Sequence, residues 1–113
     1  MSAEPLPFEL SVSEFAALLK SDPSSILLDV REPDEYATAK ITGSILLPLG
    51  EISAKVASVL PDKSAAIVVH CHHGMRSARA VEYLRQIGYR HVQNLTGGID
   101  AWSAEIDPSV PVY

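Results

Sequence analysis

The pattern of apolar and polar positions along the chain predicts an alternation of strands and helices. Short runs that are apolar at nearly every position are typical of strands buried on both faces. Between them, apolar residues recur every three or four positions, which indicates helices with one buried face. The predicted strands are residues 25–30, 43–48 and 67–70, with shorter candidates at 6–10 and 91–93. The predicted helices carry the stripes Phe15/Leu18/Leu19, Ile52/Val56/Leu60 and Val81/Leu84/Ile87, and a short one covers residues 99–102.

Local signals fix several ends of these elements. Ser11 and Glu14 have the spacing of a capping box, in which each side chain binds the other residue's backbone N–H. Pro33 favours a helix start, and Gly88 is a good left-handed cap for the helix predicted from Ser77 to Ile87. Each of these signals agrees with the apolar pattern beside it.

The order of the elements predicts an α/β fold. Strands that alternate with helices form parallel pairs, and continuous apolar strands need cover on both faces. A length of 113 residues favours one domain, with a core at about residues 8–103 and a tail at 104–113 along the surface. Ligands of such sheets bind beyond the carboxyl ends of the strands, where residues 29–31 and 71–76 fall.

Charge and composition argue against polyanionic partners and favour a reducing cellular compartment. The formal net charge is −5 and no cluster of Lys or Arg offsets it, which argues against nucleic acid or an anionic membrane as main partner. Residues 1–5 lack the basic and apolar regions of a signal peptide, and no apolar run approaches membrane-spanning length. One cysteine cannot form an internal disulfide, which suits a reducing compartment. We therefore expect a cytoplasmic protein.

The single cysteine is the candidate nucleophile. Cys71 ends an apolar strand and lies directly before a predicted helix, where unpaired backbone N–H groups can converge on an anion. Gly74 allows the tight loop that this requires, and Arg76 adds a positive charge. Helix N-termini and cations lower the pKa of a thiol, whose reactive form is the thiolate. The same features would stabilise a persulfide without any metal or organic cofactor. We expect double displacement, in which a small anionic donor such as thiosulfate gives its outer sulfur to Cys71 and cyanide or a thiol removes it.

Four segments, in order, resemble the rhodanese family of sulfurtransferases in its single-domain form. They are Leu27–Glu32 with Glu35–Tyr36, Ile41–Ile45 with Leu47–Leu49, Cys71–Ser77, and Asn94–Trp102. The resemblance implies thiosulfate sulfurtransferase activity and a five-stranded, mainly parallel sheet with helices on both faces. It also implies that Cys71 carries the persulfide and that the backbone amides of residues 72–76 surround the bound sulfur.

The other candidate site residues are substrate-binding. They are Arg31, His72, His73, Gly74, Met75 and Arg76. A cation at a helix N-terminus is unfavourable, so Arg76 predicts an anion nearby. Arg31 either forms a structural ion pair with Asp29 or touches the substrate. The side chains of His72 and His73 either tune the pocket or lie on the loop surface. We expect no metal site, because adjacent residues rarely point at one centre.

Two other functions stay open. Cysteine phosphatases and arsenate reductases of similar fold place five residues between cysteine and arginine, whereas four separate Cys71 from Arg76. The smaller loop fits a sulfur atom better than a tetrahedral phosphate. Domains of the family also serve as non-catalytic binding modules, usually when the cysteine is missing. A sulfur-accepting protein could equally be the acceptor, and the sequence leaves the physiological donor and the oligomeric state open.

Overall fold

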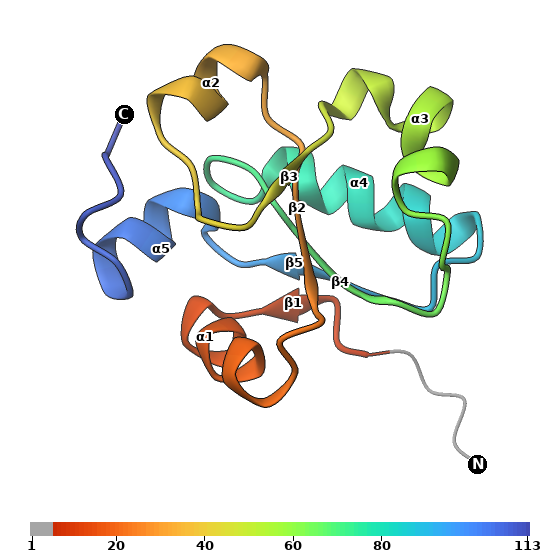
Figure 1. Cartoon of the computed structure of the whole chain (residues 1–113), viewed down its shortest axis with the longest axis horizontal. Helices are drawn as coiled ribbons and strands as arrows, with labels where there is room; N and C mark the ends of the chain where they lie inside the picture. The colour runs from red at the N-terminus through yellow and green to blue at the C-terminus, as the bar shows by residue number, and fades with distance from the viewer. Residues whose placement is uncertain (1–5) are drawn as a thin grey trace.

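A five-stranded sheet forms the centre of the molecule. The structure, a computed structural model, describes residues 6–113. The strand order is β1-β5-β4-β2-β3, and every neighbouring pair is parallel (Figure 1). The strands are β1 (Glu9–Leu10), β2 (Ile26–Asp29), β3 (Ile45–Leu46), β4 (Ala66–His70) and β5 (His91–Leu95). The predicted α/β class and parallel sheet are therefore confirmed.

Helices cover both faces of this sheet. They are α1 (Val12–Ser21), α2 (Pro33–Thr38), α3 (Ile52–Val59), α4 (Met75–Gln86) and α5 (Gly98–Glu105), with a 3-10 turn at Leu49–Glu51. Successive strand residues point to opposite faces. In β4, Ile67 and Val69 pack in the cluster that includes α3 and α4, whereas Val68 packs in the cluster with α1 and α5. Two cores, one on each face, thus explain why the strand is apolar at every position.

The predicted helix ends agree with the structure in part, and α5 runs from Gly98 to Glu105, longer than the predicted residues 99–102. The Ser11 hydroxyl accepts the Glu14 N–H and the Glu14 carboxylate accepts the Ser11 N–H, so the capping box is formed. Pro33 is the first residue of α2. Helix α4 starts at Met75, two residues earlier than predicted, because Gly74 has a φ of +110° and turns the chain directly into the helix.

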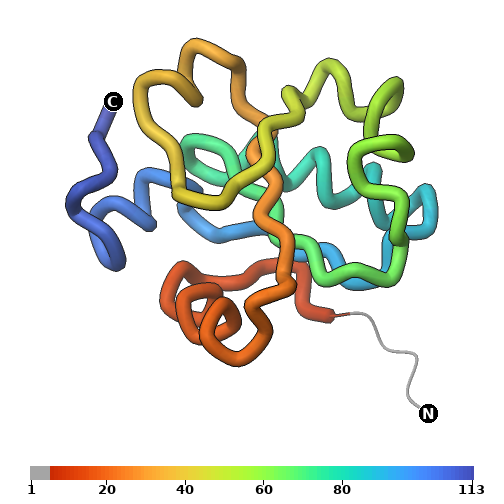
Figure 2. Tube along the Cα trace, viewed as in Figure 1, coloured from red at the N-terminus to blue at the C-terminus, as the bar shows by residue number. Residues whose placement is uncertain are grey.

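The segment after α5 returns toward α2. Figure 2 shows residues 107–113 leaving the end of α5 and running up beside α2. Val110 is buried in the core cluster that contains α1 and α5, and the Ser103 hydroxyl donates to its carbonyl oxygen. This anchor holds the rest of the segment near the carboxyl ends of β2 and β4.

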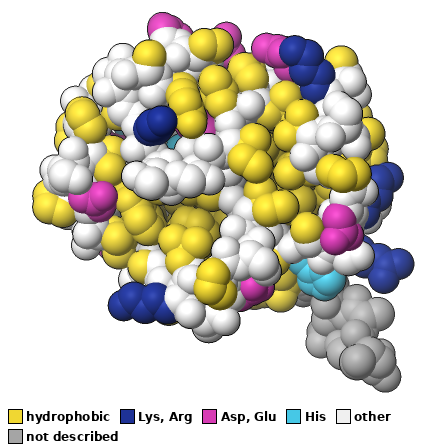
Figure 3. Space-filling view, viewed as in Figure 1, with side chains coloured by type: hydrophobic (Ala, Val, Ile, Leu, Met, Phe, Trp, Pro, Cys, Tyr) yellow, Lys and Arg dark blue, Asp and Glu magenta, His cyan; other side chains and the backbone are white. Residues whose placement is uncertain are grey.

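The charged side chains are dispersed on the face of the molecule that Figure 3 shows. On the face drawn in Figure 3, Lys and Arg side chains are scattered rather than gathered in one patch. Among residues 6–113, the helices all lack the length and apolar content that crossing a membrane would require.

Candidate active site

The loop between β4 and α4 wraps around the Cys71 thiol. Cys71 directly follows β4, and the backbone N–H of Gly74 donates to its Sγ at 3.1 Å. The Ser77 hydroxyl lies 3.4 Å from the same sulfur, in hydrogen-bonding range for so large an atom. The backbone amides of Arg76 and Ser77 also act on the sulfur. Donors from one short loop and the first turn of α4 thus converge on Sγ.

These donors outweigh the effect of burial on the thiol. Cys71 is 1% exposed and packs within the core cluster beneath α3 and α4. Burial raises the pKa of the Cys71 thiol, whereas hydrogen bonds from Ser77, Gly74 and Arg76 lower it, and the net result is a pKa below the ordinary value. The site therefore favours a thiolate, the nucleophilic form of cysteine.

Strand β5 supports the loop through Asn94, which the sequence did not single out. Its Nδ2 donates to the carbonyl oxygen of Gly74 and to the Glu9 carboxylate, while its Oδ1 accepts a hydrogen bond from the Ser77 hydroxyl. Asn94 is buried and fully bonded. Its position in the closing motif could have drawn attention to it, but its partners lie in β1 and the β4–α4 loop and leave no local signal.

The start of α5 supports the other side of the loop. The Ile99 N–H donates to the carbonyl oxygen of Cys71 at 2.9 Å, and the Asp100 N–H donates to that of His72 at 3.2 Å. Gly98 has a φ of +58°, and a Cβ atom there would lie 2.6 Å from the His72 carbonyl oxygen. The pair Gly97–Gly98, which the sequence suggested only as a turn, also allows the loop and α5 to approach closely.

The position of Arg76 predicted a nearby anion, and that anion is the carboxylate of Glu35 in the protein itself. Its two terminal nitrogens donate to the Glu35 carboxylate of α2 at 2.6 and 2.9 Å. Hydrogen bonds from Arg76 lower the pKa of Glu35 to about 2, so the carboxylate is ionised throughout the physiological range. The Arg76 side chain is 37% exposed and remains partly accessible to solvent. Its predicted contact with substrate stays a prediction.

Arg31 forms an ion pair with Asp29, which was one of the two roles predicted for it. The side chains of both residues are fully buried, and Nη2 of Arg31 lies 2.7 Å from the Asp29 carboxylate. The same nitrogen donates to the Ala39 carbonyl oxygen, and Nη1 donates to the Tyr113 hydroxyl at 2.8 Å. A contact between Arg31 and substrate would require one of these groups to move, and it stays a prediction.

The two loop histidines and Met75 form the outer rim of the loop. The His72 ring stacks on the His73 ring, with centroids 4.0 Å apart, and on the Tyr113 ring, with centroids 4.1 Å apart. Burial lowers the pKa of His72, and the neighbouring His73 adds to the effect, so His72 is mostly neutral. Met75 is 78% exposed. Tyr113 is a site residue that sequence reasoning missed.

The rim carries one group of side chains that offers possible metal ligands among the described residues. Ligand atoms of His72, His73 and Asp100 lie within 4.8 Å of one another, the one such group in the part of the chain that the structure describes. The two imidazole rings are stacked with an interplanar angle of 27°. The expectation that the chain has no metal site stays a prediction.

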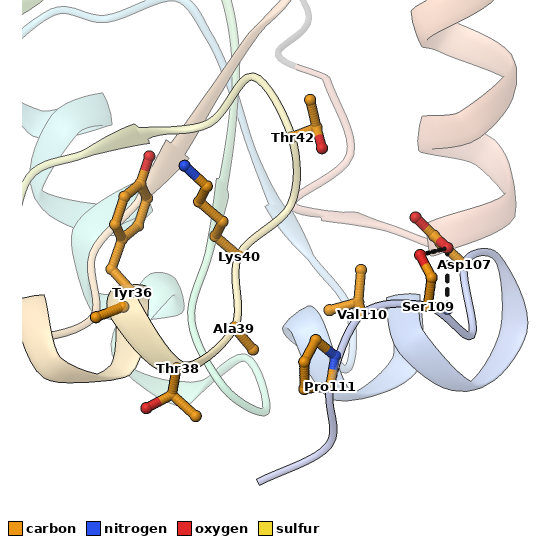
Figure 4. A pocket seen from close by; sticks show the side chains of 10 residues that line it. Tyr36, Thr38, Ala39, Lys40, Thr42, Asp107, Ser109, Val110 and Pro111 are labelled. Carbon is orange, nitrogen blue, oxygen red and sulfur yellow. Dashed lines mark hydrogen bonds between the residues drawn. The ribbon is translucent and has the colours of Figure 1, made fainter.

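A pocket of about 440 Å³ lies away from the thiol. Its walls are residues 36–42 and the segment 107–111, and Figure 4 shows Tyr36 and Lys40 on one side with Asp107, Ser109 and Val110 on the other. The seven predicted site residues are all absent from its lining. This pocket is therefore separate from the loop around Cys71.

Comparison with known proteins agrees with the loop geometry. The family model of the Rhodanese-like domain matches residues 11–105. The thiosulfate sulfurtransferase PspE of Escherichia coli is 39% identical over 70 residues, which cover 62% of this chain and 67% of PspE. The adenylyltransferase and sulfurtransferase MOCS3 of Arabidopsis thaliana is 29% identical over 96% of this chain, which spans about a quarter, 26%, of the plant protein.

A solved structure extends the agreement to the whole fold. The crystal structure of a rhodanese-related protein from Thermoplasma volcanium superposes with a TM-score of 0.80 and 33% sequence identity, covering 95% of this chain and 100% of that one. Its likeness and the family match over 95 of 113 residues, which is most of the chain, point the same way as the four sequence motifs. The chain belongs to the family of rhodanese-like domains.

Proposed function

We propose that this chain is a sulfurtransferase that moves a sulfane sulfur through a persulfide on Cys71. The donor is thiosulfate or a similar small anion, and the acceptor is cyanide, a thiol or a sulfur-accepting protein. The observation that carries the proposal is the hydrogen bond from the Gly74 N–H to Sγ, within a loop that lowers the pKa of the thiol. Family membership and the likeness to a thiosulfate sulfurtransferase support it.

The reaction has two displacements. The Cys71 thiolate attacks the outer sulfur of thiosulfate, a new S–S bond forms, and the donor's own S–S bond breaks so that sulfite leaves with the electron pair. The acceptor then attacks the terminal sulfur of the persulfide, and the Cys71 thiolate leaves. Each step conserves charge and needs no oxidant, metal or organic cofactor.

The loop stabilises the anionic sulfur in both states. Backbone N–H groups fixed by the fold need no reorganisation when charge moves between Sγ and the terminal sulfur. The N–H groups of Gly74, Arg76 and Ser77 supply this field, and the Ser77 hydroxyl adds a donor that can rotate. His72, His73 and Met75 form the rim over which donor and acceptor arrive. Because the overall charge of −5 repels an anionic donor, these local dipoles must supply its attraction to the site.

A phosphatase is the second candidate, and the geometry disfavours it. Both terminal nitrogens of Arg76 are occupied by Glu35, so the planar fork that would hold a phosphate is already used. The short loop also leaves less room for a tetrahedral ion. A purely non-catalytic module is disfavoured because Cys71 is present with a lowered pKa. We further propose that the domain acts in the cytoplasm.

Intact mass spectrometry tests the reaction directly. Thiosulfate should add the mass of one sulfur atom to the protein, and cyanide should remove it with release of thiocyanate. Cys71→Ser should fold but gain no mass, because a hydroxyl cannot carry the sulfane sulfur. Turnover of an aryl phosphate with no sulfur uptake from thiosulfate would overturn the proposal.

A further inference from the structure

Tyr113 joins two parts of the active site that are otherwise separate. Its ring lies nearly parallel to the His72 ring, at an interplanar angle of 8° and a centroid distance of 4.1 Å. Its hydroxyl accepts from Nη1 of Arg31 at 2.8 Å and donates to the Glu35 carboxylate at 2.9 Å. One side chain thus spans from the loop that follows Cys71 to the carboxylate that holds Arg76.

The position of the ring is fixed from three directions. Stacking on His72 sets its plane, and the two hydrogen bonds of the hydroxyl set its direction within that plane. The Arg31 guanidinium also lies 5.5 Å from the ring centroid. Because the Arg31 guanidinium and the Glu35 carboxylate are both charged, both hydrogen bonds of the hydroxyl are of the stronger, charge-assisted kind. These contacts together hold the side chain, which is 38% exposed, in one orientation.

We propose that Tyr113 is a specificity-determining residue that limits the size of the sulfur donor reaching Cys71. The inference rests on the proposed function and deepens it. The ring stacks on His72, the residue after Cys71, and its hydroxyl bonds to Glu35, so in this proposal Tyr113 borders the approach to Sγ, which belongs to a residue only 1% exposed. A compact donor such as thiosulfate passes along this approach, whereas a donor whose sulfane sulfur is attached to a bulky group meets the ring.

Two donors that react in the same way but differ in size can test the role of the ring. An aryl thiosulfonate gives its outer sulfur to the Cys71 thiolate and leaves as an aryl sulfinate, just as thiosulfate leaves as sulfite. The bond formed and the bond broken are of the same type. A difference between the two donors therefore reports on access to the loop, not on the chemistry at the sulfur.

The test compares kcat/KM for benzenethiosulfonate and thiosulfate, with cyanide as acceptor, in the wild-type protein and two variants. Tyr113→Ala removes the ring and should raise the ratio of aryl donor to thiosulfate about tenfold, the scale of losing a stacked, anchored ring. Tyr113→Phe keeps the stack on His72 but loses both anchors, and should raise the ratio by less. Tyr36→Phe is the matched control, since that hydroxyl donates to the Ser44 carbonyl oxygen instead.

The ratio separates selectivity from stability. A variant that is partly unfolded loses activity toward both donors alike, so the ratio stays the same. A ratio for Tyr113→Ala within twofold of the wild type, or an equal rise in Tyr36→Phe, would overturn the inference. If the wild-type protein takes up no sulfur from thiosulfate, the proposed function itself fails. Sulfur uptake with an unmoved ratio removes only the role of Tyr113.

Discussion

Replacing Ser77 with alanine tests whether side-chain hydrogen bonding activates Cys71. The Ser77 hydroxyl is 3.4 Å from Sγ and is the strongest of the donors that lower the pKa of the thiol. Its removal leaves burial opposed only by backbone N–H groups. We therefore expect Ser77→Ala to raise the pKa of Cys71 and to slow the formation of the persulfide at neutral pH.

The size of the effect follows from the partners of the hydroxyl. A hydrogen bond to a charged group contributes about 1.5–3 kcal/mol. The single proton of Ser77 is shared between Sγ and the Asn94 side chain, which favours the lower end of this range. A loss of about 1.5 kcal/mol changes the thiol–thiolate equilibrium constant roughly tenfold. At neutral pH, the thiol of Ser77→Ala should therefore be alkylated about tenfold more slowly than that of the wild type.

The assay is the rate of alkylation of Cys71 by iodoacetamide as a function of pH. Because the chain has one cysteine, the rate reports on this thiol alone. Ser103→Ala is the matched control, since its buried hydroxyl bonds to the Val110 carbonyl oxygen and is not among the partners of Cys71. An alkylation profile of Ser77→Ala that coincides with those of the wild type and the control would refute the role of the hydroxyl.

Two further predictions concern the support of the site. Gly98→Ala should lower the free energy of unfolding by at least about 2 kcal/mol and suppress sulfur transfer, because the new Cβ would lie 2.6 Å from the His72 carbonyl oxygen at a positive φ. Gly50→Ala, with open space around its Cβ, is the control, and equal denaturation midpoints for the two would contradict this reason. His70 is fully buried, and burial lowers its pKa from 6.5 to about 4. The unfolded chain then binds a proton near pH 6.5 that the folded chain refuses, so up to about 3 kcal/mol of stability is lost as the pH falls from 6.5 to 4. Urea titrations across this window should show a larger loss in the wild type than in His70→Asn, which keeps only the loss due to carboxylates such as Glu35, and identical slopes would contradict it.

The sheet could largely be predicted because its central strands carry a strong local signal. Strands β2 and β4 are apolar on both faces, and their burial against two cores explains that pattern. Strand β5 was underestimated, since residues 91–93 were expected and the strand runs to Leu95. Its interior holds Gln93 and Asn94, whose side chains bond to Pro7 and Glu9 near β1. Polar residues satisfied by a distant strand give no apolar signal.

The site could be predicted only where local geometry determines it. Cys71 and Gly74 are three residues apart, so the strand, loop and helix around them determine their contact. The partners of Arg76 and His72, in contrast, lie far from them in the sequence. Glu35 lies 41 residues before Arg76, and Tyr113 reaches His72 from the segment after α5. Such pairs depend on how elements pack, and the sequence indicated only that Arg76 needed an anion.

Deep burial of the thiol is compatible with sulfur transfer because the reactive atom changes during the cycle. In the resting state Sγ is enclosed by the core, and its charge depends on donors that two neighbours hold in place: Asn94 binds the Gly74 carbonyl oxygen, and Ile99 binds that of Cys71. In the proposed persulfide, the sulfur that the acceptor attacks lies one S–S bond, about 2 Å, beyond Sγ. An acceptor therefore needs to reach only the terminal sulfur, whereas the donor must bring its sulfur to Sγ itself. In the proposed cycle, access should consequently restrict the first displacement more than the second, so we expect Tyr113 to discriminate between donors by size and not between acceptors.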